Sequence, residues 1–145
     1  MFLKNPDGYL EYNQKNLIDI INIVREKQPD IVYLPHEKDA HKDHATTYEL
    51  VTEAVKRAGG QCFQECTNSP WTTQTMLCYE VWTPLQDITY SEDITSVIDV
   101  KITALERHAS QIANVKYDEA VRGLNRYRGI MTEKEIMLSV LKYSP

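Results

Sequence analysis

The chain has 145 residues, 42% hydrophobic and 26% charged, which is typical of one globular domain with a sizeable core. Its net charge of -5, without a run of Lys or Arg, argues against electrostatic binding to nucleic acid. No stretch reaches the roughly 18 consecutive apolar residues of a membrane span, and no secretory signal is visible. We therefore expect one cytoplasmic domain over residues 1–145.

The first half of the sequence alternates between helical and strand patterns. Apolar residues recur every three or four positions from Leu17 to Val24, which predicts an amphipathic helix over residues 14–27. The wholly apolar run 31–34 predicts a short parallel strand that is covered on both faces. A second helix follows to residue 58, and we expect His44 to point inward from its first turn.

After Gly59 and Gly60 the patterns become β-like and then helical. Strands are predicted at 61–63, within 74–85 and at 96–100. Helices are predicted at 101–112 and 117–127, and the tail 132–145 also fits a helix. This is an α/β pattern that begins on a turn and a helix, whereas doubly wound domains usually begin on a central strand.

The three cysteines, Cys62, Cys66 and Cys78, are odd in number and lack disulfide-framework spacing. Cys62 and Cys66 could supply half of a zinc site, but no second pair follows them. Free thiols in a reducing cytoplasm are the simpler interpretation.

The nonapeptide HEKDAHKDH, residues 36–44, holds three of the four histidines and two aspartates. It lies between a predicted strand and a predicted helix, where α/β proteins place their chemistry. Imidazole and carboxylate are zinc ligands, and a ligating histidine usually passes its other ring nitrogen to a carboxylate or carbonyl. The alternative is a His- and Asp-rich turn that merely caps the following helix.

A longer stretch, PHEKDAHKDHATTYELVTEAV, resembles the second metal motif of the zinc-dependent N-deacetylases of the PIG-L/LmbE family. PDGYL, QPDIVYLP, YEVWTP and KITALERHASQ resemble the family in the same order, so the resemblance covers most of the chain. It implies a Rossmann-like three-layer α/β sandwich with a mainly parallel sheet. It also implies a Zn2+-dependent hydrolase that removes an N-acetyl group from an amino-sugar conjugate.

The resemblance also implies residue roles. His44 would be a zinc ligand, His41 would face the substrate carbonyl and stabilise the oxyanion or protonate the leaving amine, and Asp43 would orient an imidazole. Weaker candidates for contacts with the substrate or with these groups are His36, Asp39, Trp82 and His108. For Trp82 and His108, a place in the core or on the surface is the alternative.

One part of the family pattern has no match in the sequence. The family opens with a strand ending in A-H-P-D-D, whose His and first Asp are the other two zinc ligands and whose second Asp is the general base. The two Pro-Asp pairs here, at 6–7 and 29–30, follow Asn5 and Gln28 instead. We therefore expect the carboxy-terminal portion of such a deacetylase, without its first strands and inactive alone. Either an amino-terminal segment or self-association at the exposed sheet edge would complete it.

Two other interpretations remain open. DAHKDH differs by one residue from the H-x-H-x-D-H turn of metallo-β-lactamase-like hydrolases, but those need further histidines downstream, where only His108 occurs. The chain could also be a non-catalytic α/β relic that binds a partner or a sugar.

Overall fold

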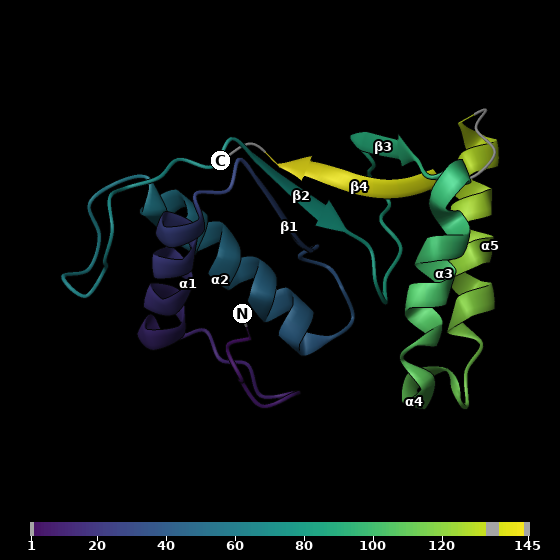
Figure 1. Ribbon diagram of the computed structural model, residues 1–145, viewed down its shortest axis with the longest axis horizontal. Coiled ribbons are helices and arrows are strands. Elements are labelled where there is room, and N and C mark those ends of the chain that lie inside the picture. Colours follow the sequence, from purple (N-terminus) through teal and green to yellow (C-terminus); the bar gives the residue numbers. More distant parts are fainter. Residues whose placement is uncertain (1, 133–136, 144–145) are drawn as a thin grey trace. The chain divides into compact units, whose positions relative to one another are not determined.

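The computed structural model describes residues 2–132 and 137–143. The chain forms two compact units, residues 1–89 with 141–145 and residues 90–140, and Figure 1 labels the elements of each. None of the described helices is long and apolar enough to span a membrane.

The first unit begins with helix α1 (Gln14–Lys27), as the apolar periodicity predicted. The helix starts at Asn13, whose side chain accepts a hydrogen bond from the backbone N–H of Asn16. It ends at Gln28, which adopts the left-handed conformation with φ 49° and donates its N–H to the carbonyl of Val24.

The rest of the first unit is built on a β-α-β motif. Strand β1 (Ile31–Pro35), helix α2 (Lys42–Ala58) and strand β2 (Thr75–Tyr79) follow in order, and β1 and β2 pair in parallel. A parallel pair needs a long crossover connection, which α2 supplies. The predicted α/β class with a parallel sheet is confirmed.

The hydrophobic core of this unit lies between α1, α2 and one face of the strand pair. Its buried members come from all four elements: Leu17, Ile21, Val24, Leu34, Leu50, Ala54, Val55, Ala58, Met76 and Cys78. Both helices therefore cover the same face, and Figure 1 shows them on one side of the strands. Ile31 and Tyr33 face the other way and are 48% and 61% exposed, so the prediction that β1 is covered on both faces was wrong.

No strand forms over residues 61–63, where one was predicted, and this segment is a loop that follows residues held by Arg25. Arg25 is buried and donates hydrogen bonds from Nε to the carbonyl of Ala58 (3.2 Å) and from Nη2 to the carbonyl of Gly60 (2.5 Å). The predicted strand within 74–85 is also shorter, since β2 ends at Tyr79 and residues 80–85 form a loop.

The second unit pairs two short strands with a helical hairpin. Its elements are β3 (Tyr90–Asp93), a 3-10 turn (Thr95–Val97), α3 (Ile98–Glu106), α4 (Ala109–Ile112), α5 (Tyr117–Met131) and the first part of β4 (Met137–Tyr143), whose residues 141–143 are counted with the first unit. Ile94, Ile98 and Ile102 form its buried cluster, with Val121 packed against them.

Two predictions for the second unit were wrong. Residues 96–100 are helical, because the carboxylate of Asp93 accepts hydrogen bonds from the Thr95 N–H (3.0 Å) and hydroxyl (2.6 Å) and so starts a helix. The tail contains a strand at 137–143, which pairs antiparallel with β3, whereas a helix was predicted. Residues 133–136 and 144–145 of that predicted helix lie outside the described residues.

Candidate functional site

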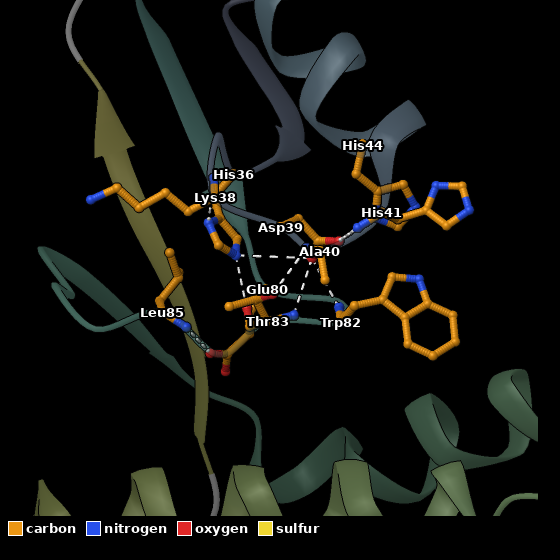
Figure 2. Close-up of polar contacts among 10 residues, drawn as sticks. All are labelled: His36, Lys38, Asp39, Ala40, His41, His44, Glu80, Trp82, Thr83 and Leu85. Carbon is orange, nitrogen blue, oxygen red and sulfur yellow. Dashed lines mark hydrogen bonds and ion pairs between the residues drawn. The ribbon is translucent and has the colours of Figure 1, made fainter. Parts of the chain in front are cut away.

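The turn between β1 and α2 is organised by the carboxylate of Asp39, whose side chain has no exposed surface. Its Oδ1 accepts the N–H of His41 (3.0 Å) and lies 3.0 Å from Nδ1 of His44. Its Oδ2 accepts the N–H groups of Trp82 (2.9 Å) and Thr83 (3.3 Å) from the loop after β2. Figure 2 shows this single side chain joining the turn to the 80–85 loop.

The charge state of Asp39 determines which atom carries the proton in its hydrogen bond with His44. Burial alone would raise the pKa of the Asp39 carboxyl, but the N–H donors of His41, Trp82 and Thr83 and the nearby His44 outweigh it, so the pKa is lowered. An ionised carboxylate has no proton to share, so Nδ1 of His44 carries the proton in their hydrogen bond. In the neutral form of this imidazole the lone pair is therefore on Nε2.

His41 stands beside His44 at the start of α2. It is the residue that precedes the first turn of the helix, and its ring centroid lies 4.9 Å from that of His44 with the planes tilted by 40°. Its Nδ1 is buried and has no hydrogen-bond partner among the described residues. Figure 2 shows both imidazoles projecting to the same side of the turn. His44 is half-buried rather than in the core, with 26% of its side chain exposed.

His36 is a structural residue of this turn. It is 3% exposed, its Nε2 lies 2.8 Å from the carbonyl of Thr83, and its Nδ1 accepts the N–H of Lys38 (3.2 Å). Because Nδ1 is an acceptor, Nε2 carries the proton and donates it to that carbonyl. Neither nitrogen is left to bind a metal or a substrate.

The other sequence candidates lie at different distances from this turn. Asp43 accepts the N–H groups of Gly8 (2.6 Å) and Leu10 (3.2 Å), so it fastens the 8–10 segment to α2, and the carboxylate that contacts an imidazole is that of Asp39. Trp82 lies on the loop joined to the turn and is 44% exposed. His108 belongs to the second unit, where it is exposed and precedes α4.

Sequence reasoning missed Thr83, which contributes three groups to the site. Besides the two backbone contacts described above, its hydroxyl accepts the N–H of Ala40 (3.0 Å). No local pattern links residue 83 to residue 39. The nearest signal was the family-like string YEVWTP, which contains Thr83 without marking its role.

The donor set fits a zinc ion only in part. His44, with Asp39 behind its Nδ1, has the arrangement usual for a zinc-ligating histidine. Across residues 2–132 and 137–143, however, no three His, Cys, Asp or Glu side chains come together to hold one ion. A catalytic zinc needs about three protein ligands, so these residues alone do not make such a centre.

Part of the chain is similar to a family of deacetylases and to one of its relatives. Residues 1–55 match the family model described as PIG-L: GlcNAc-PI de-N-acetylase. The 1D-myo-inositol 2-acetamido-2-deoxy-alpha-D-glucopyranoside deacetylase of Rhodococcus jostii (strain RHA1) is 26% identical over 139 residues, covering 74% of this chain. The chain spans 47% of that relative, about half its length.

Solved structures share the fold. The conserved protein TT1542 from Thermus thermophilus has a TM-score of 0.86 and 25% identity, with 99% of this chain and 64% of that chain covered. N,N'-diacetylchitobiose deacetylase from Pyrococcus horikoshii has a TM-score of 0.85 and 22% identity, with 98% and 56% covered. GalB, the 4-carboxy-2-hydroxymuconate hydratase from Pseudomonas putida KT2440, has a TM-score of 0.78 and 20% identity, with 97% and 62% covered.

These neighbours confirm the predicted Rossmann-like α/β fold. The hydratase among them shows that the fold by itself does not choose the reaction. The function must therefore be argued from the turn at residues 36–44 and the loop joined to it.

Proposed function

We propose that this chain carries part of the active site of an amino-sugar N-deacetylase. Its similarity in sequence and fold to proteins of the PIG-L/LmbE kind supports this. The observation that carries the proposal is the hydrogen bond of 3.0 Å between Asp39 and Nδ1 of His44. It holds the imidazole in the tautomer whose Nε2 can bind a metal. Two of the similar proteins are named as deacetylases of acetylated sugars, which supports this substrate class.

In this proposal His44 is one ligand of a zinc ion. The other ligands come from polypeptide outside these 145 residues, either an amino-terminal segment or a second protomer. The 47% coverage of the curated relative supports this, because the rest of that protein has no counterpart here. Zinc, when bound, lowers the pKa of a coordinated water and polarises an acyl carbonyl.

His41 is the residue that we assign to the acetamide group of the substrate. Its buried Nδ1 has no partner among the described residues, and such an unpaired group costs on the order of 1–3 kcal/mol. A partner in the complete site would remove that cost. A positioned imidazole can also protonate the departing amine.

Asp43 acts in this proposal by holding the 8–10 segment against the first turn of α2. That turn carries His44 and follows directly on His41, so Asp43 is a positioning residue for both.

Zinc titration by calorimetry tests the metal assignment. In the chain fused behind the amino-terminal part of the Rhodococcus relative, we expect His44→Ala to remove zinc binding, and His108→Ala, a histidine of the second unit, to leave it unchanged. The same fusion should release acetate from N-acetylglucosaminides. In that fusion His41→Ala should keep zinc and lose turnover, and a fully active His44→Ala protein would contradict the proposal.

A non-catalytic sugar-binding domain is the second candidate. The lack of three converging metal donors among the described residues favours it. Sugar binding by the fusion protein without zinc binding or acetate release would support this candidate over the deacetylase.

A further inference from the structure

The loop Glu80–Leu85, here called the Trp82 loop, is fixed through its backbone to the turn at residues 36–44. The N–H groups of Trp82 and Thr83 both donate to Oδ2 of Asp39, at 2.9 and 3.3 Å. The carbonyl of Thr83 accepts from Nε2 of His36 at 2.8 Å. These bonds set the backbone position of residue 82 relative to the turn.

On this fixed backbone the side chain of Trp82 is left at the surface. It is 44% exposed, although tryptophan is a residue type that folded proteins largely bury. The other tryptophan, Trp71, packs against the core and donates its Nε1–H to the carbonyl of Pro29 (3.0 Å). Figure 2 shows the indole of Trp82 projecting to the same side as the imidazoles of His41 and His44.

One carboxylate therefore contacts both the imidazole of His44 and the backbone of Trp82. Oδ1 of Asp39 contacts His44, and Oδ2 of the same residue holds the N–H of Trp82. A flat aromatic side chain whose backbone is already ordered loses little entropy when a ligand covers it.

The chemistry of the indole indicates the kind of ligand. Its face is apolar and electron-rich, and it attracts the slightly positive edge of a neighbouring group. The axial C–H groups of a gluco-configured pyranose form such an apolar, slightly positive surface. An acetamide group alone is too small to cover the indole.

We propose that Trp82 is a specificity-determining residue that stacks on the pyranose ring of the substrate, while His41 contacts the acetamide group and His44 binds the zinc ion. This inference rests on the proposed function and adds that the chain recognises the sugar ring itself. It assigns the sugar contact to one exposed side chain on the Trp82 loop.

Binding to the full chain tests the inference without any need for turnover. In the Trp71→Phe variant, Trp82 is the remaining tryptophan and reports by fluorescence. We expect methyl N-acetyl-glucosaminide and methyl glucoside to change its emission, and N-methylacetamide at the same concentration to leave it unchanged. An equal change with N-methylacetamide, or no change with either sugar, would overturn the inference.

The second test uses substitutions, and saturation-transfer NMR on the sugar measures how strongly each variant binds it. We expect Trp82→Ala to weaken sugar binding about tenfold or more, as for other buried tryptophan contacts, and Trp82→Phe to retain most of it. Val81→Ala is the matched control, because it shortens the neighbouring side chain, which is 49% exposed, and should leave binding unchanged. Unaltered binding by Trp82→Ala would overturn the inference.

The two proposals fail in different ways. If the fusion protein releases acetate and Trp82→Ala leaves its KM unchanged, the stacking role is wrong and the deacetylase stands. If no zinc binds and no acetate is released, but sugar binding still depends on Trp82, the deacetylase is wrong and the stacking role stands.

Discussion

Replacing Asp39 by Asn keeps the shape of the side chain and removes its charge. An amide has one acceptor oxygen, whereas Asp39 accepts hydrogen bonds on both oxygens. If the oxygen keeps the Trp82 and Thr83 N–H groups, the NH2 group faces the His41 N–H and Nδ1 of His44. His44 can then change its tautomer and accept, but the His41 N–H is left without an acceptor.

The expected loss of unfolding free energy follows from the hydrogen bonds that the substitution removes or weakens. One buried N–H without a partner costs about 1–3 kcal/mol, and the remaining hydrogen bonds lose the roughly twofold strengthening that a charged acceptor provides. We expect Asp39→Asn to lower the free energy of unfolding by about 2–5 kcal/mol. The change of tautomer also moves the proton of His44 to Nε2, so under the proposed function the fusion protein should lose zinc binding as well as stability.

Urea unfolding at pH 7, followed by tryptophan fluorescence, measures the effect. With a slope of about 2 kcal/mol per molar urea, the midpoint should fall by roughly 1–2.5 M. Asp19→Asn is the control, because Asp19 pairs with Lys15 at 2.7 Å on the exposed face of α1, where such pairs contribute little. A midpoint for Asp39→Asn equal to that of Asp19→Asn would refute the reasoning. The 15N shifts of the His44 ring report the tautomer directly.

Three further predictions concern the pH dependence of stability, the loop residues that Arg25 holds and the thiol of Cys78. Folding lowers the pKa of Asp39, so its stabilisation is fully present above the ordinary value of 3.8 and is lost as the pH falls through the folded-state pKa. The urea midpoint of the wild-type chain should therefore decline below about pH 4, and that of Asp39→Asn should decline less. Arg25→Met removes the side-chain donor to the carbonyls of Ala58, Gly60 and Asn68 and should cost about 2–4 kcal/mol, seen as faster chymotryptic cleavage within residues 59–74. Burial, with a contribution from Glu37, raises the pKa of Cys78 to about 11. Its thiol should therefore react with a disulfide reagent at pH 8 only when urea unfolds the chain. In Cys78→Ala this additional, urea-dependent reaction should be missing.

The elements that could be predicted are those with a local signal. The period of apolar residues between Leu17 and Val24 placed α1 at its observed bounds, and the apolar run before Pro35 placed β1 to within one residue. The position of the His- and Asp-rich turn between a strand and a helix was also correct. These features depend on residues a few positions apart, which sequence patterns record well.

The features that could not be predicted depend on distant partners. Trp82 and Thr83 donate to Asp39 across more than 40 positions, and nothing near residue 39 indicates that its acceptors are taken by that loop. The tail 137–143 is a strand because it pairs with β3, and this non-local pairing overrides the helical pattern. The contact of Asp43 with the 8–10 segment also joins residues more than 30 positions apart, and the family resemblance, which gave Asp43 the role of orienting an imidazole, did not indicate it.

Asp39 binds the Trp82 loop by hydrogen bonds from main-chain N–H groups, not through the side chain of residue 82. Any amino acid except proline presents that N–H, so the residue at this position can be exchanged while the imidazole pair keeps its geometry. Under the proposed roles, the residue that selects the ligand, Trp82, can therefore change without altering the residues that act on it, His41 and His44. Random substitution at position 82 is therefore an economical library for retuning which ligand is accepted.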